Sequence, residues 1–186
     1  MHVALKNVRA LLAASILVLG GSAVAQAEAL EASLQSKIDA IVAAAKTWAV
    51  DPAVVAAVRA RNAATPAQFA KLNQDAWKAL TVMDPLVREL TKNEAALALK
   101  AKRTPAVAEI FLNAADGTKV AFGAKTTSWS HAGKAKHDVP MSGGVWQGDV
   151  ELDESTGLKQ LQVAVPVLDG DKAIGSLVVG LSLSKL

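Results

Sequence analysis

Two patterned runs near the end of the chain, residues 160–168 and 173–183, constrain its fold more than any other feature. The second run has no charged residue and follows a turn sequence, DGDK, at 169–172. In the first run every second residue is apolar, and these residues are Leu161, Val163, Val165 and Val167. Period-two alternation bounded by Gly and Asp predicts paired antiparallel strands. One face of such a sheet must be covered, and the helical half of the chain can cover it.

The first half of the chain has the apolar spacing of helices. From Glu28, apolar residues recur every three or four positions, which predicts one long amphipathic helix. Asp51-Pro52 then matches a capping carboxylate followed by proline at the first helical position, and Asp84-Pro85 repeats that signal. Thr104-Pro105 is expected to end the helical part.

Two segments match the capping box, in which Ser or Thr is followed three positions later by Glu or Gln. The first is Thr65–Gln68, and the helix that it opens is expected to continue through Leu72 and Leu80 to Met83. The second is Thr91–Glu94, which is expected to open a helix over 95–102. The helical part therefore extends over residues 28–105.

The remaining residues, 106–186, are predicted to form the sheet. Asp116-Gly117 is a strong signal for a tight turn between two strands. Residues 123–144 show no clean period and are expected to form a long loop with at most one helical turn, which in a compact domain is either functional or mobile. A chain of 186 residues suits one domain with its own core. The predicted fold class is α+β, with a long N-terminal helix and a helical hairpin packed on an antiparallel sheet.

Residues 1–27 have the features of a secretory signal peptide. Lys6 and Arg9 precede a short apolar segment, and small residues follow it, with cleavage motifs that end at Ala25 and Ala27. The apolar segment is shorter than the roughly 20 residues that a membrane span needs, although an uncleaved anchor helix is the alternative. We therefore expect export to the periplasm, cleavage near Ala25 or Ala27, and a mature single domain over 28–186.

Composition excludes several classes of site and partner. The chain has no cysteine, so it has no disulfide, no cysteine-ligated zinc and no thiol nucleophile. The predicted leader contains two of the 20 basic residues and none of the 17 acidic ones, so the mature chain carries 18 − 17 = +1. Its basic residues are scattered among acids, unlike the basic stripe of a nucleic-acid-binding protein. No nucleic-acid partner is expected.

The predicted loop at 123–144 holds the residues that suggest metal binding or catalysis. His131 and His137 lack a third ligand at a suitable spacing, and the nearby lysines would repel a cation, so we interpret both as solvated loop residues. The serines around His131 stand in no nucleophile motif. We predict no catalytic residue, no metal site and no cofactor, so the protein is not expected to be an enzyme.

An acidic patch follows the predicted loop. Asp149, Glu151 and Asp153 alternate along the chain, which places their side chains on one face of a strand. Alternating charge is ordinary on the outer face of a sheet, so a solvated face is the preferred interpretation. A site for the amine of a ligand is the alternative.

The four tryptophans divide into two pairs. Trp48 and Trp77 lie on predicted helices and are expected in the core. Trp129 and Trp146 flank the predicted loop, where a large apolar ring with one N–H donor suits either the core or the wall of a ligand pocket.

The segments FLNAADGTKVAFG, VWQGDVELDESTG and QVAVPVLDGDKAIGSLVVGLSL together resemble the PDC/Cache family of extracytoplasmic sensor domains. DPAVVAAVRARNA at 51–63 and LNQDAW at 72–77 are similar to the helical part of single-Cache members. The resemblance implies a PAS-like antiparallel sheet backed by the long helix. It also implies a small-molecule pocket between the sheet and the loop after the first hairpin, for a ligand such as an organic acid or an amino acid.

The resemblance implies candidate ligand-binding residues as well. By position, Trp129 matches the tryptophan of the family's loop motif, although its neighbours TTS and SHA differ from that motif. The predicted ligand-binding residues are Trp129, His131 and Trp146.

The function implied is that of a soluble periplasmic small-molecule-binding sensor-type domain, accessory to a membrane signalling or transport protein. An interaction module that keeps the Cache fold without a ligand pocket is the alternative. The first helix is expected either to pair with a second copy of the chain, giving a homodimer, or to pack on the sheet.

Overall fold

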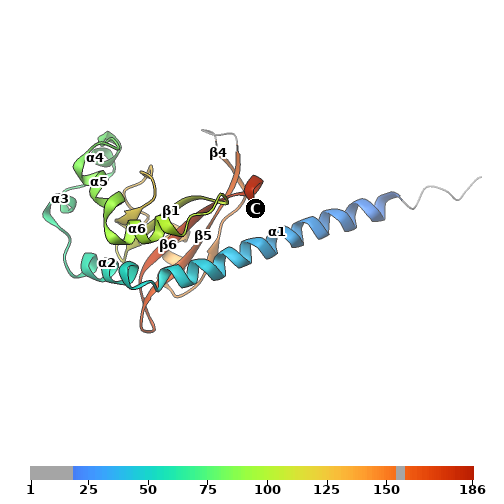
Figure 1. The fold of residues 1–186 in the computed structure, drawn as a ribbon, viewed down its shortest axis with the longest axis horizontal. Coiled ribbons are helices and arrows are strands. Elements are labelled where there is room, and N and C mark those ends of the chain that lie inside the picture. Colours follow the sequence, from blue (N-terminus) through green and yellow to red (C-terminus); the bar gives the residue numbers. More distant parts are fainter. Residues whose placement is uncertain (1–18, 154–157) are drawn as a thin grey trace, which may run out of the picture. The chain divides into compact units, whose positions relative to one another are not determined.

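The computed structural model describes residues 19–153 and 158–186 (Figure 1). The chain divides into two compact units, Met1–Ser36 and Lys37–Leu186. The described strands and all helices after the first belong to the second unit.

The first helix, α1, extends over Leu19–Ala49. Residues 1–18 of the predicted leader lie outside the described residues, and residues 19–27 form the start of α1. Among the described residues, no helix alone has the length and apolar character to cross a membrane. The segment Glu31–Ala49 and the next helix, Pro52–Ala63, are long and apolar enough only when they are taken together, and the chain bends by 63° between them.

Five shorter helices follow in the described part of the helical half, and Figure 1 shows three of them, α3, α4 and α5, grouped together. The helix after α1 begins as predicted, because Asp51 Oδ1 accepts a hydrogen bond from Ala53 N at 3.0 Å. The helices are α2 (Pro52–Ala63), α3 (Ala67–Ala70), α4 (Gln74–Ala79), α5 (Pro85–Lys92) and α6 (Glu94–Ala101).

The prediction of one long helix from Thr65 to Met83 is wrong. Thr65 caps no helix, and α3 begins after Pro66 and lasts four residues. Asn73 then accepts a hydrogen bond from Ala76 N at 2.8 Å and starts α4 as a separate helix. An asparagine side chain competes for backbone N–H groups, so it favours a new helix start over continuation of the old helix.

The second predicted capping box is wrong in the same way. Asn93, rather than Thr91, caps α6, since its Oδ1 accepts from Ala96 N at 2.8 Å. Thr91 lies inside α5, where its hydroxyl donates to Arg88 O. The helix predicted over 95–102 is otherwise confirmed.

The sheet has the strand order β2-β1-β6-β5-β3, with β4 also paired to β5, and every pairing is antiparallel. The predicted hairpin at the end of the chain is confirmed: β5 and β6 join at Gly170, which has a positive φ of 61°. Glycine adopts such a φ without strain and suits the tight turn. The strands are β1 (Val107–Ala114), β2 (Lys119–Phe122), β3 (Trp146–Gln147), β4 (Glu151–Asp153), β5 (Leu158–Asp169) and β6 (Lys172–Ser182).

One face of the sheet is apolar. Leu112, Leu177 and Val165 lie side by side across β1, β6 and β5, and no part of any of them is exposed. Helix α2 packs on these three strands, and Val58 lies so close to Gly175 that an added Cβ would be 2.8 Å from its Cγ1. The alternation predicted for β5 is confirmed by the burial of this face.

The opposite face mixes aromatic and polar residues. Phe111, Val178 and Ala164 form one row across β1, β6 and β5, and Asn113 and Ser176 form part of the next. A further helix, α7 (Ala135–Met141), packs against β5 and β6 on this side. The loop predicted over 123–144 therefore contains a helix longer than the single turn expected, and it covers the sheet.

Candidate functional site

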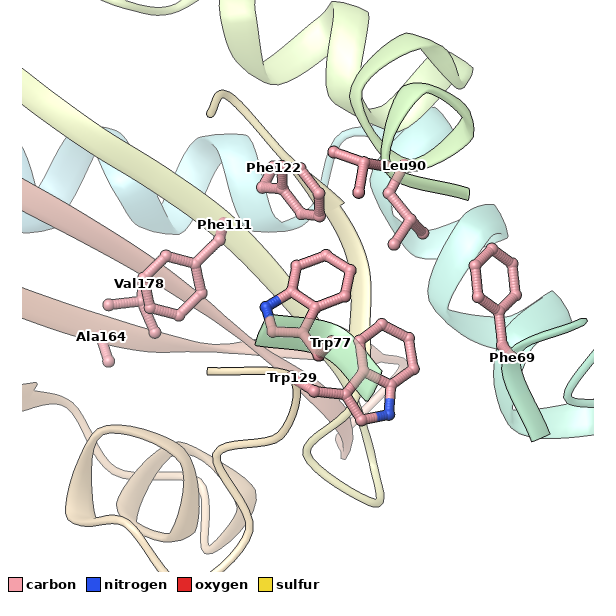
Figure 2. Close-up of a cluster of buried hydrophobic side chains, with 9 residues drawn as sticks. Phe69, Trp77, Leu90, Phe111, Phe122, Trp129, Ala164 and Val178 are labelled. Carbon is pink, nitrogen blue, oxygen red and sulfur yellow. The ribbon is translucent and has the colours of Figure 1, made fainter. Parts of the chain in front are cut away.

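The first predicted site residue, Trp129, lies inside a buried aromatic cluster. Trp129 is only 4% exposed, and its ring centroid is 5.2 Å from that of Trp77 and 5.9 Å from that of Phe69. Figure 2 shows the two indoles next to each other, with Phe111 and Val178 on the strands beside them. The prediction that Trp77 belongs to the core is confirmed, and Trp129 joins it there.

Hydrogen bonds join the segment that carries Trp129 to α4. Gln74 receives a hydrogen bond from Trp129 N at 3.0 Å and donates one to Thr127 O at 2.8 Å. Trp77 Nε1 donates to Thr126 O at 2.8 Å. These contacts fix the segment before His131, so α4 determines where the next residues meet the sheet.

The second predicted residue, His131, is buried on the polar face of the sheet. It is 7% exposed, its ring stacks on Phe111 at a centroid distance of 4.9 Å, and its Nδ1 contacts Lys119 Nζ. The interpretation of His131 and His137 as solvated loop residues is therefore wrong, since His137 is 3% exposed. Burial, and then the charges of Lys119 and Lys136, lower the pKa of His131 from 6.5 to about 3.

Lys119, at the start of β2, is the most unusual residue of this face because no part of it is exposed. Its Nζ donates to Asn113 Oδ1 at 2.7 Å, contacts His131 Nδ1, and lies 4.2 Å from the ring centroid of Phe111. Burial lowers the pKa of Lys119 well below its usual 10.5, while the charge of Glu109 acts in the opposite direction. A buried amine of this kind requires hydrogen-bond partners, and Asn113 and His131 supply them.

The hydrogen bonds continue from Asn113 to α7. Asn113 Nδ2 donates to Ser176 Oγ at 2.9 Å, and Ser176 Oγ lies 2.8 Å from His137 Nδ1. His137 Nε2 is 3.2 Å from Ala115 O, where the carbonyl can only accept. We call the chain of side chains His131, Lys119, Asn113, Ser176 and His137 the polar network.

A second polar group lies beside the third predicted residue, Trp146. Lys136 Nζ donates to Gln162 Oε1, and Gln162 Nε2 donates to Glu109 Oε2 at 2.8 Å. The same Lys136 Nζ lies 6.0 Å from the ring centroid of Trp146, which is half-buried and packs against the aromatic cluster. Trp146 therefore borders the aromatic cluster on one side and the charged end of Lys136 on the other.

The structure brings the predicted residues to one face of the sheet together with residues that the sequence analysis missed. The sequence contained a signal for them, because Asn113, Lys119 and Ser176 are polar residues inside otherwise apolar strands. Among the residues with described side chains, every buried side-chain nitrogen or oxygen has a hydrogen-bond partner. No group of three metal-ligating side chains was found in the described part of the chain.

The acidic patch is as exposed as predicted, as far as its side chains are described. Asp149 and Glu151 are exposed, while the side chain of Asp153 lies outside the described part. Val150 and Leu152 are also largely exposed, so the β4 segment contributes little to the core.

Comparison with protein-family models and with curated proteins found no match. Comparison with solved structures found the sensor domain of the V. cholerae histidine kinase DctB, at a TM-score of 0.50 and 16% identity. That alignment covers 89% of this chain and 58% of the other, so this chain spans well under two thirds of that domain.

Two chemoreceptor ligand-binding domains are also similar. The Campylobacter jejuni Tlp3 domain, in complex with 4-methylisoleucine, has a TM-score of 0.42 at 14% identity, over 81% of this chain and 54% of the other. The Pseudomonas aeruginosa PctC domain, in complex with GABA, has a TM-score of 0.36 at 15% identity, over 59% of this chain and 48% of the other.

The likeness to the DctB domain concerns the fold alone. This chain has the α+β fold of the PDC/Cache-type sensor domains, as the resemblance of its sequence predicted.

Proposed function

We propose that the protein is a periplasmic small-molecule-binding domain of the sensor type, not an enzyme. The observation that carries this proposal is the polar network on the sheet face beneath α7. Apolar strands gain nothing in stability from a buried lysine, since its desolvation is costly even when it is paired. The same groups, presented to a ligand, would supply donors and acceptors in a dry environment where each hydrogen bond is strong.

The ligand-binding residues proposed are Trp129, His131 and Trp146, with the amine of Lys136 beside Trp146. Two lysines and Glu109 on this face suit a ligand that carries a carboxylate, with or without an amine, so the proposed class is an organic acid or an amino acid. Binding requires Lys136 and Gln162 to exchange their mutual hydrogen bond for bonds to the ligand. Trp146 would then lie over the ligand as an apolar wall.

The proposed setting follows from the first residues of the chain. A leader over 1–27, cleaved near Ala25 or Ala27, would deliver a domain of residues 28–186 to the periplasm. There it would serve a membrane signalling or transport protein, as a monomer or as a homodimer. The mass of the protein purified from the periplasm tests the leader, since an intact N-terminus would contradict it.

A second candidate is an interaction module that has kept the fold without a ligand pocket. The packing of Trp129 between Phe69 and Trp77 favours it, and so does the complete internal pairing of the polar network. A partner that co-purifies with the protein, without any small-molecule ligand, would support this candidate.

Thermal denaturation in the presence of organic acids and amino acids separates the two candidates. A ligand that binds only the folded state raises the melting temperature in proportion to the logarithm of its concentration. We expect at least one acid to do so in the wild type and in Lys134→Gln, and to lose its effect in Lys136→Gln. Both variants remove one positive charge within α7 or at its start, but Lys134 is exposed and Lys136 borders Trp146. No stabilisation by any acid, or equal stabilisation of both variants, would reject the proposed site.

A further inference from the structure

A groove of about 560 Å³ lies outside the site proposed above, between α2 and α6 beside the edge strand β2. One wall is formed by small apolar residues of α2, and the opposite wall by the first residues of α6. Its lining includes Ala57, Ala60, Arg61, Pro66, Asn93 and Ala95.

Arg61 is the one strongly basic side chain among the lining residues, and it is only 8% exposed. Its Nη1 donates to Lys119 O at 2.8 Å, and its Cζ lies 4.4 Å from the ring centroid of Phe69. These two contacts hold the guanidinium plane but use a single N–H of the five that arginine carries. Among the described residues Arg61 forms no ion pair, so it is a buried cation without a counter-ion.

A buried cation without a counter-ion is uncommon in a folded protein. Desolvating a charge is costly, so buried arginines normally face a carboxylate. Burial lowers the pKa of Arg61 more than the charges of Asp116 and Glu89 raise it, and neither carboxylate forms an ion pair with Arg61. Because no buried side-chain nitrogen lacks a partner among the described residues, the N–H groups of Arg61 that bond to no protein atom are open to solvent at the groove, where an anion can accept from them.

The first turn of α6 adds a second anion-binding feature to the groove. Asn93 is fixed by its Nδ2, which donates to Val120 O at 2.9 Å, and by its Oδ1, which caps Ala96 N. The N–H groups of a helix's first turn have no partner within the helix, and the helix dipole favours an anion there. Glu94, at the start of α6, also lines the groove, but its side chain is exposed, so solvent weakens its repulsion of an anion.

We propose that this groove binds a small carboxylate with a short apolar chain. The carboxylate accepts two parallel hydrogen bonds from the guanidinium of Arg61, as the planar fork of arginine permits. The apolar chain lies against the alanine wall of α2 and Pro66. None of the lining residues belongs to the site under α7, so this proposal stands independently of the proposed function.

Arg61 also has a structural role, because it satisfies a carbonyl of the edge strand β2. The test therefore leaves Arg61 intact and fills the groove from the opposite wall. Ala60→Leu places a larger side chain in the groove at an exposed helical position, where leucine is well tolerated. Ala63→Leu is the matched control, since Ala63 is an exposed residue of the same helix that does not line the groove.

The experiment is a titration of the purified, 15N-labelled protein with acetate, butyrate and isovalerate, followed by NMR. We expect saturable shifts of the Arg61 Nε–Hε signal and of the Asn93–Ala95 amides, larger with butyrate than with acetate. Butyramide and sodium chloride at equal ionic strength should leave these signals in place. Ala60→Leu should weaken butyrate binding by about tenfold or more, and Ala63→Leu should not.

The proposal is overturned by linear, unsaturable shifts, by equal shifts with butyramide, or by unchanged binding in Ala60→Leu. If Ala60→Leu fails to fold, Ala56→Leu fills the same groove from a neighbouring exposed position and is held to the same criteria. Butyrate shifts that Ala60→Leu abolishes while Arg61 keeps its contact with Lys119 O would establish the site.

Discussion

The two faces of the sheet are built from the same strands but satisfy opposite physical requirements. On the face toward α2, rows such as Leu112, Leu177 and Val165 are fully buried and have no polar atoms in their side chains. On the face toward α7, the next residue along β1 is Asn113, which joins Lys119 in a buried hydrogen-bond network. The difference teaches that one strand can supply apolar packing from one side and a buried hydrogen-bond network from the other.

The two faces also differ in what their burial contributes. Burying an apolar side chain such as leucine contributes roughly 1.5–3 kcal/mol to the free energy of unfolding, and the side chain has no polar atom that needs a hydrogen-bond partner. A buried amine has to recover its lost hydration through hydrogen bonds, and at best it breaks about even with an apolar residue of the same size. The apolar face and the aromatic row of the opposite face therefore hold the fold together, whereas the polar network contributes little net stability.

The largest effect is expected from a truncation on the apolar face. Leu177→Ala removes a fully buried side chain from the centre of β6 and should lower the free energy of unfolding by about 3 kcal/mol. Urea denaturation at constant pH measures the loss. The matched control is Leu152→Ala on β4, where the side chain is mostly exposed and the loss should be small. Equal losses in the two variants would show that the apolar face does not dominate stability.

On the polar face, removing one partner should cost less. Lys119→Met keeps the length of the side chain but leaves Asn113 Oδ1 and His131 Nδ1 without their donor. An unsatisfied buried group costs about 1–3 kcal/mol, and removal of the desolvated amine offsets part of that cost. We therefore expect a net loss of about 1–2 kcal/mol in urea denaturation.

A triple variant shows whether the polar network serves the fold. Lys119→Met combined with Asn113→Leu and His131→Phe removes donors and acceptors together, which in other proteins is often neutral or stabilising. Recovery of most of the stability lost by Lys119→Met would support the view that the polar face is kept for binding. A loss that grows with each substitution would instead assign the network to the fold.

The sequence predicted the apolar face well because its signal is local. Alternation along β5 and the DGDK turn are properties of neighbouring residues, so they identified the final hairpin without knowledge of its surroundings. The cap at Asp51 is local in the same sense, and it was also predicted correctly. The two mistaken capping boxes were local conflicts, in which Asn73 and Asn93 started helices that Thr65 and Thr91 had been expected to cap.

The polar face was predicted poorly because it depends on contacts between distant parts of the chain. His131 and Phe111 are 20 positions apart in sequence, and His137 of α7 meets Ser176 of β6 across 39 positions. A histidine in a segment rich in Gly, Ser and Lys looks solvated until the sheet beneath it is known. The sequence left Trp129 open between the core and the wall of a pocket, and only its contacts with Phe69 and Trp77 show that it packs in a core.

A smaller effect is expected from acid. In the folded protein His131 takes up a proton only near pH 3, whereas in the unfolded chain it does so near pH 6.5. The stability linked to this ring is therefore complete above pH 6.5 and is lost as the pH falls toward 3. Between pH 6.5 and 5, before carboxylates titrate, the loss should be about 1.5 kcal/mol in urea denaturation.

The control for acid sensitivity is His131→Asn, whose Oδ1 can still accept a hydrogen bond from Lys119 but does not titrate. We expect the free energy of unfolding of this variant to be flat between pH 6.5 and 5. An equally steep decline in the variant would mean that another group on the polar face, rather than His131, controls the response.

The smallest effect on stability should come from an exposed contact between α2 and the β5–β6 turn. Arg59 donates two hydrogen bonds to Asp169, from Nη2 to Oδ1 at 2.6 Å and from Nε to Oδ2 at 2.9 Å, but both side chains are largely exposed. These hydrogen bonds hold the pKa of Asp169 below its ordinary value. In Arg59→Gln, NMR titration should show that pKa rising toward normal, while the melting temperature stays almost unchanged because solvent screens exposed pairs. A fall in melting temperature as large as that of Leu177→Ala would mean that this ion pair holds α2 on the sheet. It would contradict the view that burial on the apolar face dominates the stability of the protein.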